Sequence, residues 1–417
     1  MGRKKKKRKR TKYSNRGAKK SLVKANELFK IAFQYHQTGQ LQDAKALYCQ
    51  ILQIIPNHSD ALHMYGVLAY QVEKFDVSAN LIRKAIAINP RVPDYHSNLS
   101  LAIRSVGKLE EAIACCKRAI ELKPDYAEAY NNMGVMFKDE GKPEEAISCY
   151  QKAVQLKPDY AEAYCNMGVM FKTGGKVDEA IRSFKHVIEL DQENATAKHL
   201  LAALTGKTPE NAPRQYVKDL FDQYSKRFDY HLVEKLEYRT PALLRKSLNS
   251  LFEDSLHFQN AIDLGCGTGL SGMEFRSVSD RLTGLDISPK MLQVAKNKKI
   301  YDALQHVDIV DYLNITNEKY DLFIATDVFI YIGNLKPVFQ SIQNCSLNGA
   351  YLIFSTESTN ENSYVLRQTG RYAHPLPYIE LLAKQHDFVI EMSSQKVIRK
   401  EKEQKIMGNL FILKGNI

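Results

Sequence analysis

A short apolar run ends at an aspartate and passes into a glycine-rich loop in the stretch AIDLGCGTGLSG, residues 261–272. The glycines are Gly265, Gly267 and Gly269, a G-x-G-x-G spacing, and Asp263 comes just before them. A dinucleotide site has the spacing G-x-G-x-x-G and holds a pyrophosphate at a helix N-terminus. Because a carboxylate repels a pyrophosphate and attracts an ammonium or sulfonium group, Asp263 favours a ligand with a cationic end.

A second carboxylate, that of Asp286, ends the next predicted strand, 17 residues after Gly269. From this position a carboxylate can accept hydrogen bonds from both hydroxyls of a ribose. Together the two aspartates and the loop describe an adenosyl ligand that has a cationic amino-acid end and no phosphate, and S-adenosylmethionine fits this description. The alternative is that the glycines only form a tight turn between a strand and a helix.

Predicted strands and helices alternate around this loop, from about residue 256 onward. The strands are expected at 261–265, 281–288, 303–309, 320–328 and 349–358. Helices such as 289–299 and 335–345 separate them, which predicts a doubly wound parallel sheet with its ligand at the carboxyl ends of the strands. The segments 388–398 and 405–415 are joined by a connection too short for a helix, so they predict an antiparallel hairpin on one edge.

The stretches DLGCGTG, LDIS and YDLFIATDVFIYIG closely resemble the motifs of class I S-adenosylmethionine-dependent methyltransferases, over about residues 207–417. The resemblance implies an α/β Rossmann-like domain with an antiparallel last strand. It also implies that the loop from Asp263 to Gly269 wraps the methionine moiety of the cofactor, and that Asp286 holds its ribose.

Three further cofactor contacts follow from the resemblance. Ile287 would pack on the adenine, and Asp308 and Ile309 would lie near its amino edge. Asp311 lies close enough along the chain to serve in place of Asp308.

The segment 212–255 resembles the helical lid that comes before the sheet in this superfamily. Its aromatic residues recur at helical spacing and are expected mostly to pack: Tyr216, Phe221, Tyr224 and Phe228. Tyr224, Asp229 and His231 are the lid residues that could reach the cofactor. The order of repeats (described below), lid, sheet and the motif GRYAHP resembles bacterial repeat-containing proteins assigned as methyltransferases.

Methyl transfer needs few catalytic groups from the protein, because a sulfonium is already an activated methyl donor. The protein mainly has to align the nucleophile with the methyl group and exclude water. A base is needed only if the nucleophile arrives protonated. Asp327, after the fourth strand, and His374, in GRYAHP, are the candidate catalytic residues, with Tyr331 and Arg371 as substrate contacts. For His374 the alternative is a loop or helix-capping role. The stretch ATDVFIYIG lacks the Pro-Pro turn of many base and amide N-methyltransferases, which argues against a nucleobase acceptor.

A repeat of 34 residues occupies the first half of the chain, where the spacing of proline is constant at Pro56, Pro90, Pro124 and Pro158. Small residues and turn glycines keep the same step, and these columns resemble the tetratricopeptide repeat over five units, residues 23–192. The resemblance implies an all-α solenoid of antiparallel helix pairs with a groove that binds proteins or peptides. A capping helix is expected to extend this array to residue 206.

Asn98, Asn132 and Asn166 recur at the 34-residue spacing and form the candidate partner groove. They resemble the asparagine ladder of the O-linked N-acetylglucosamine transferase, whose amides hold a peptide backbone. An amide both donates and accepts, which suits a main chain of any sequence. The alternative is that they are polar residues on a solvated face, alike because of recent duplication.

The net charge of +12 belongs to one segment, because residues 1–20 hold 12 of the basic residues and no acid, leaving 47 basic against 47 acidic residues elsewhere. Residues 1–22 are therefore expected to be a disordered tail that contacts RNA, an acidic partner or an anionic membrane surface, or only aids solubility. The seven cysteines form no C-x-x-C pair, so we expect a reduced, cytoplasmic compartment with neither disulfides nor a metal site. No stretch is long and apolar enough for a transmembrane helix.

These observations predict three parts: a basic tail (1–22), a helical array (23–206) and a methyltransferase domain (207–417). The expected function is S-adenosylmethionine-dependent methyl transfer, with a protein or peptide partner or substrate docked on the array. Two alternatives remain open. One is an interaction scaffold with a degenerate methyltransferase domain, and the other is an RNA-associated methyltransferase guided by the tail.

Overall fold

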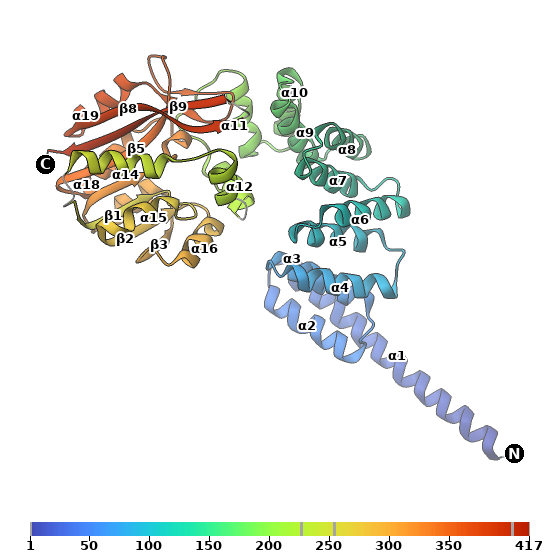
Figure 1. Cartoon of the computed structure of the whole chain (residues 1–417). Coiled ribbons are helices and arrows are strands. Elements are labelled where there is room, and N and C mark those ends of the chain that lie inside the picture. Colours follow the sequence, from blue (N-terminus) through green and yellow to red (C-terminus); the bar gives the residue numbers. More distant parts are fainter. Residues whose placement is uncertain (1, 226–227, 253–255, 402–403, 417) are drawn as a thin grey trace. The chain divides into compact units, whose positions relative to one another are not determined.

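A computed structural model describes residues 2–225, 228–252, 256–401 and 404–416 of the chain (Figure 1). The chain divides into two compact units, Met1–Asp191 and Gln192–Ile417. Helix α11 (Ala195–Leu204), which the sequence analysis assigns to the repeat array as a cap, belongs to the second unit. Within that unit, Nε2 of its His199 lies 2.9 Å from the carbonyl oxygen of Gly370.

Described residues of the first unit form ten helices, in pairs (Figure 1). Their bounds are α1 (Gly2–Gln37), α2 (Leu41–Ile54), α3 (Ser59–Gln71), α4 (Phe75–Ile88), α5 (Pro93–Ser105), α6 (Leu109–Leu122), α7 (Ala127–Asp139), α8 (Pro143–Leu156), α9 (Ala161–Thr173) and α10 (Val177–Leu190). The helices α2, α4, α6 and α8 each end two residues before a proline of the 34-residue period, as expected of a residue that disfavours helix before it. The predicted array of helix pairs is confirmed.

The turns inside the helix pairs depend on residues with positive φ. Gly39, Gly107, Gly141 and Gly175 have φ of 75° to 83°, and Glu73, with φ of 58°, takes the equivalent place in the second pair. Glycine adopts this left-handed conformation at little cost because it has no Cβ. This explains the turn column of the repeat.

The basic N-terminal segment, for which the sequence predicts disorder, forms part of helix α1, which begins at Gly2 and includes residues 2–22. Lysine and arginine have high intrinsic helix propensity, and this segment contains no proline to stop the helix. The helix that the first repeat requires therefore continues back through it.

The second unit surrounds a mixed sheet with helices. Its helices are α11, α12 (Arg214–Tyr224), α13 (Phe228–Tyr230), the π-helical η2 (His231–Lys235), α14 (Thr240–Leu251), α15 (Leu270–Phe275), η3 (Arg276–Val278), α16 (Pro289–Lys298), α17 (Ile309–Ile315), η4 (Phe329–Tyr331), α18 (Lys336–Cys345) and α19 (Leu376–Gln385). Its strands are β1 (Phe258–Leu264), β2 (Ser279–Asp286), β3 (Ala303–His306), β4 (Tyr320–Ala325), β5 (Ser346–Ser358), β6 (Val365–Leu366), β7 (Tyr372–His374), β8 (Phe388–Glu401) and β9 (Gln404–Gly415).

The strand order is β3-β2-β1-β4-β5-β7-β6, and the contacts from β3 through β5 are all parallel. Strand β9 pairs antiparallel with both β5 and β8, so β8 and β9 form the predicted hairpin. The chain reverses its direction of winding between β1 and β4, and open sheets of this kind bind ligands at such a switch point. The predicted parallel sheet with an antiparallel last strand is confirmed.

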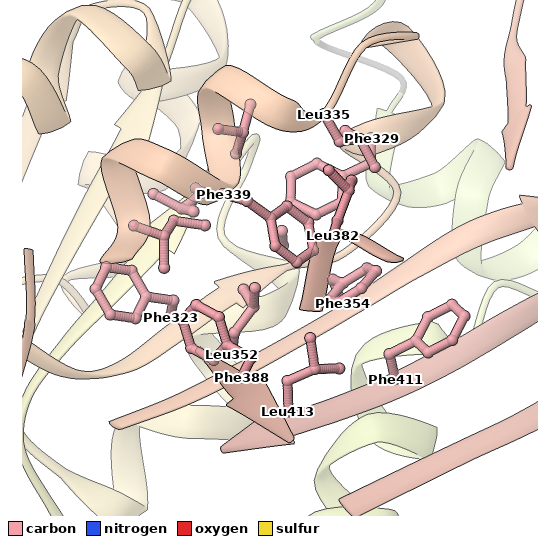
Figure 2. Close-up of a cluster of buried hydrophobic side chains, with 14 of the residues drawn as sticks. Phe323, Phe329, Leu335, Phe339, Leu352, Phe354, Leu382, Phe388, Phe411 and Leu413 are labelled. Atoms are coloured by element: carbon pink, nitrogen blue, oxygen red, sulfur yellow. The ribbon is translucent and has the colours of Figure 1, made fainter. Parts of the chain in front are cut away.

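Each face of the sheet has its own apolar core, and side chains of β4 alternate between them. Phe323 packs with α18 and α19, whereas Leu322 and Ile324 pack with α14 and α15. Figure 2 shows the first core, in which the ring centroids of Phe354 and Phe411 lie 4.9 Å apart. These two cores fix the strands, and the carboxyl ends of the strands in turn hold the residues of the site.

The close approach of helices within a pair depends on the small-residue column. A Cβ added at Gly168 would lie 2.8 Å from Cε1 of the fully buried Phe184, and one at Gly134 would lie 2.7 Å from Cε1 of Tyr150. Contacts this short require either the ring or the helix to move. The periodic glycines therefore set the distance between helices.

We expect Gly168→Ala to lower the free energy of unfolding by about 1–3 kcal/mol, because its methyl group overpacks the Phe184 ring. Gly174→Ala is the matched control, since a Cβ there would meet only ordinary contacts at 3.4 Å or more and its φ is −83°. Thermal unfolding of the full chain measures both. Equal melting temperatures for the two variants would contradict this packing.

Candidate functional site

A cavity of about 720 Å³ opens at the carboxyl ends of the parallel strands. Residues that follow β1, β2, β3 and β4 line it, together with α12, η2, Arg371 before β7 and Arg399 of β8. All lining residues belong to the second unit. The volume lies within the range of small-molecule sites.

The glycine loop lies between β1 and α15 and lines the cavity. Gly265, Gly267 and Gly269 all have positive φ, of 80°, 53° and 93°. A Cβ at Gly265 would lie 2.6 Å from Cγ2 of Val328, whereas the nearest atom to one at Gly267 is 3.9 Å away. The chain thus needs glycine at 265 for packing, while Gly267 presents bare backbone to the cavity.

Asp286 lies at the carboxyl end of β2, where its carboxylate joins two loops. Its Oδ2 accepts the N–H of Gly267 at 2.8 Å, and its Oδ1 accepts the N–H of Ser288 at 2.7 Å. Burial raises the pKa of Asp286 to about 6, while these two backbone donors act in the opposite direction. A carboxylate has about four lone-pair positions, so both oxygens can still accept hydroxyl donors from the cavity.

The other residues expected at the adenine also line the cavity: Ile287, Asp308 and Ile309. Asp308 is the N-cap of α17, with Oδ1 accepting the N–H of Val310 at 2.9 Å, and it lies 3.1 Å from Nη2 of Arg214. Asp311, the alternative to Asp308, forms a bidentate ion pair with the same arginine. The structure therefore places Asp308 rather than Asp311 in the lining.

Asp263 differs from expectation, because it is fully buried beneath the loop and is absent from the cavity lining. The hydroxyl of Tyr301 donates to its Oδ2 at 2.7 Å, and its Oδ1 has no hydrogen-bond partner among the described residues. Burial raises its pKa to about 7. Its described hydrogen bond is therefore to Tyr301, and its contact with the cationic end of the cofactor remains a prediction.

Asp327, predicted as a catalytic residue, and Tyr331 and Arg371, predicted as substrate contacts, all line the cavity. Asp327 follows β4 with a φ of 54°, and its carboxylate contacts Nη1 of Arg399 at 2.9 Å and Oγ of Ser355 at 3.2 Å. The positive φ is costly for a residue with a side chain, and such strain concentrates at functional sites.

His374, predicted as a catalytic residue, is fully buried and is not in the cavity lining. Its Nε2–H donates to the carbonyl oxygens of Ile332 and Gly333, each at 3.0 Å. Burial lowers its pKa to about 4, so the ring is neutral near pH 7. These two hydrogen bonds connect β7 to the segment after η4.

Aromatic residues of the lid close one side of the cavity, although the sequence analysis expects them mostly to pack. Phe221, Tyr224 and Phe228 line it, and the Phe221 ring lies 5.2 Å from that of Tyr331. Tyr216 instead packs on His199, as predicted. Phe221 and Tyr224 are three residues apart in α12 and so share one face of that helix, and the ring of Phe228 lies 5.9 Å from that of Phe221.

Arg399 is a site residue that the sequence analysis misses. It lies in β8, where the register with β9 shifts between Val397 and Arg399, and its side chain is 2% exposed. It contacts Asp327 and Glu357, which are 72 and 42 residues away. Nothing local marks it, because it stands in the charged run RKEKEQ like a surface residue.

The asparagine ladder of the first unit joins neighbouring repeats. The Nδ2 groups of Asn98, Asn132 and Asn166 lie 2.8, 3.2 and 3.1 Å from His63 Nε2, Ser97 Oγ and Asn131 Oδ1, respectively, each partner being 35 residues earlier. All three asparagines are half-buried. These contacts between repeats explain why asparagine recurs at the 34-residue spacing. Peptide binding by the three residues remains a prediction.

The described part of the chain offers little support for metal binding or for disulfide bonds. No group of three or more potential metal ligands is found there. All seven cysteines are free. None of the helices described has both the length and the apolar character that a membrane crossing requires.

Each of the two units matches known protein families. Residues 259–411 match the methyltransferase domain family, residues 101–141 and 134–174 match the TPR repeat family, and residues 161–194 match the tetratricopeptide repeat family. The chain is a tetratricopeptide-repeat protein with a C-terminal methyltransferase domain. The cavity described above belongs to this domain.

Curated relatives of the methyltransferase domain are mostly O-methyltransferases. The malonyl-[acyl-carrier protein] O-methyltransferase of Hamiltonella defensa is 33% identical over 95 residues, 23% of this chain and 36% of that protein. The ubiquinone biosynthesis O-methyltransferase of Nitrosomonas europaea is 30% identical over 120 residues, 27% of this chain and 49% of that protein. The chain thus spans between about a third and a half of the length of these relatives.

Solved structures resemble each part separately. The N-methyltransferase NodS from Bradyrhizobium japonicum, in complex with S-adenosyl-L-homocysteine, covers 48% of this chain and 98% of its own, at 16% identity and a TM-score of 0.40. MamA covers 40% of this chain and 96% of its own, at 25% identity and a TM-score of 0.35.

The buried Asp263 of the methyltransferase domain gives a pH dependence of stability. Its folded pKa of about 7 lies above the ~3.9 of an unfolded aspartate, so between these values the folded chain holds a proton that the unfolded chain has lost. The free energy of unfolding therefore falls as pH rises through this range, and the loss is complete above pH 7.

We expect Asp263→Asn, which removes this titration, to gain about 2–3 kcal/mol in free energy of unfolding relative to the unaltered chain between pH 5 and pH 8. Denaturant unfolding of the ligand-free chain at both pH values measures the gain. Asp219→Asn, at an aspartate of α12 whose Oδ1 accepts a hydrogen bond from the neutral amide of Gln215, is the matched control and should give a pH-independent difference. A pH-independent difference for Asp263→Asn as well would contradict the assignment.

Proposed function

We propose that the chain is an S-adenosylmethionine-dependent methyltransferase whose tetratricopeptide array docks a protein or peptide partner or substrate. The observation that carries the proposal is Asp286, a carboxylate at the end of β2 that faces the cavity and is oriented by the N–H groups of Gly267 and Ser288. A carboxylate held in this way suits two neighbouring hydroxyl donors, as on a ribose.

The residues present fit this cofactor. Asp286 would hold the ribose, Ile287 would pack on the adenine, and Asp308 and Ile309 would lie at the adenine edge. The bare backbone of Gly267 gives room for the methionine moiety, because no side chain there occupies the cavity. When bound, the cofactor supplies an electrophilic methyl group.

The chain's own residues would align the acceptor and keep water away. The aromatic rings of Phe221, Tyr224 and Phe228 cover the cavity from the lid side, which excludes water from the reacting groups. Asp327 is the proposed base for an acceptor that arrives protonated, since its carboxylate reaches the cavity after β4. Tyr331 and Arg371 would contact the acceptor.

The docking role of the array is supported by its architecture. Stacked helix pairs present an extended surface that suits a peptide or protein. The half-buried amides of Asn98, Asn132 and Asn166 are the proposed contacts, and their carbonyl oxygens can accept main-chain N–H groups while the Nδ2 groups join the repeats. The seven free cysteines support a reducing, cytosolic compartment for this activity. The basic segment 1–22 is proposed to contact RNA or an acidic surface.

We expect Asp286→Ala to weaken S-adenosylmethionine binding by about 10- to 100-fold, because it leaves ribose hydroxyls and two backbone N–H groups without a partner in a closed site. Isothermal titration measures the dissociation constant. Asp280→Ala removes an aspartate from the opposite end of the same strand, where the side chain is 64% exposed, and should leave affinity unchanged. Equal affinities for Asp286→Ala and the unaltered chain would refute the cofactor assignment.

A further inference from the structure

Two carboxylates of the lid contact the loops that follow β1 and β2. Asp222, in α12, accepts the hydroxyl of Ser288 on its Oδ1 at 2.6 Å, and Ser288 belongs to the segment after β2. Asp229, in α13, accepts the hydroxyl of Thr268, which belongs to the glycine loop after β1. The partners are 66 and 39 residues apart in the chain. The fold therefore places the lid against both of the loops that Asp286 joins.

Asp286 completes a continuous path between these two lid contacts. Its Oδ1 accepts the N–H of Ser288, and its Oδ2 accepts the N–H of Gly267 in the glycine loop. The path runs from Asp229 through the glycine loop and Asp286 to Asp222. Both ends of the path lie on the lid, and its middle is the carboxylate that is proposed to hold the ribose.

Ser288 connects Asp222 to Asp286. Ser288 is fully buried and is the N-cap of α16, and its Oγ accepts the N–H of Met291 at 3.1 Å while donating to Asp222. Its own N–H donates to Oδ1 of Asp286 at 2.7 Å. Because the hydroxyl both accepts and donates, its orientation is fixed from two sides, and the N–H beside it is directed at the carboxylate of Asp286.

Asp222 carries its negative charge near pH 7. Its side chain is 14% exposed, and Nζ of Lys218, one helical turn earlier, lies 2.7 Å from its Oδ2. Burial acts to raise the pKa of Asp222, but the donors Lys218 and Ser288 act in the opposite direction, and the pKa is lowered. Burial, and after it the charge of Asp222, raises the pKa of Asp286.

The geometry points to Asp222 as a positioning residue for the cofactor, which fixes Ser288 and, through it, the carboxylate of Asp286. This inference rests on the proposed function, because Asp286 is the proposed ribose contact. Asp229 acts on the glycine loop in the same way. Neither lid carboxylate lines the cavity, so each contributes to cofactor affinity without touching the cofactor.

The test measures the binding of S-adenosylhomocysteine to the full chain by isothermal titration at pH 8. We expect Asp222→Ala to weaken binding about 3- to 10-fold, because Ser288 loses the hydrogen bond that fixes it. Asp222→Asn keeps an oxygen that accepts this hydroxyl, so its affinity should stay within about twofold of that of the unaltered chain. Undiminished affinity in Asp222→Ala, or an Asp222→Asn affinity as low as that of Asp222→Ala, would overturn the inference.

Asp219→Ala is the matched control. Asp219 lies three residues earlier in α12, where its Oδ1 accepts a hydrogen bond from Nε2 of Gln215 at 2.7 Å. The substitution removes an aspartate from the same helix and leaves the contact with Ser288 in place, so affinity should not change. Circular dichroism checks that the variants fold. A loss of affinity as large as that of Asp222→Ala would show a general effect on α12 and would also overturn the inference.

The pH dependence of binding is a readout that a loss of packing alone would not change. Titratable groups of several elements interact with Asp286: Asp222 of α12, Asp263 of β1, Cys266 of the glycine loop and His306 of β3. Affinity should fall as the pH drops through the pKa of Asp286, about 6, because the ionised carboxylate is the better acceptor.

In Asp222→Asn the midpoint of this fall should move to lower pH, because a negative charge that favours protonation of Asp286 is removed. The other interacting groups are the same in both proteins, so the difference between them reports Asp222. A midpoint that stays in place, or moves to higher pH, would overturn the inference.

Failure of the proposed function is separately visible. If S-adenosylhomocysteine does not bind the unaltered chain, the cofactor assignment fails. Carbon-13 NMR titration of the Asp286 carboxyl group in the ligand-free chain then still measures whether Asp222→Asn lowers its pKa, and an unchanged pKa would overturn the action of Asp222 on Asp286. If the cofactor product binds equally well to the unaltered chain and to Asp222→Ala, the positioning inference alone fails.

Discussion

The carboxylate of Asp286 is the contact on which the site depends. It accepts one N–H from the glycine loop after β1 and one from the start of the segment that leads into α16, so it holds the ends of two adjacent parallel strands in register. The same group faces the cavity, so one side chain both holds two loops together and is the proposed contact with the ribose. Burial raises the pKa of Asp286 to about 6, and the two backbone N–H donors oppose this shift. They help to keep the carboxylate ionised near pH 7, and the ionised carboxylate is the form that accepts hydrogen bonds from hydroxyl groups.

The order of the strands determines which charged residues lie at each end of the cavity in the methyltransferase domain. Asp286 and Asp308 line the cavity at the β2 and β3 end, where Arg214 pairs with Asp308. Arg371 and Arg399 line the β5, β7 and β8 end, and Asp327 lies between the two ends after β4. The arginines come from segments far apart in the chain, and the register shift in β8 accompanies the inward position of Arg399. Bulges near active sites commonly re-aim a side chain in this way. The hairpin β8–β9 therefore contributes a buried group to the site as well as closing the sheet.

Local patterns predicted the elements well and the environment of single side chains less well. Three features follow from patterns along the sequence and could therefore be predicted: the strand–helix alternation, the 34-residue period and the glycine loop. The burial of Asp263 could not be predicted, because only the fold brings Tyr301, 38 residues later, against it. The partners of His374, the carbonyls of Ile332 and Gly333, leave no signature in sequence, so its burial could not be predicted. Arg399 was missed because a buried arginine and a surface arginine look alike until tertiary contacts are known.

The most direct test of the central claim is a crystal structure of the full chain with S-adenosylhomocysteine. The account predicts that the two ribose hydroxyls lie within hydrogen-bonding distance of the Asp286 carboxylate, with the adenine against Ile287 and the Gly267 backbone next to the amino-acid end. The same crystals should not take up nicotinamide adenine dinucleotide at the glycine loop. A ribose oriented away from Asp286, or a dinucleotide bound over that loop, would contradict the account.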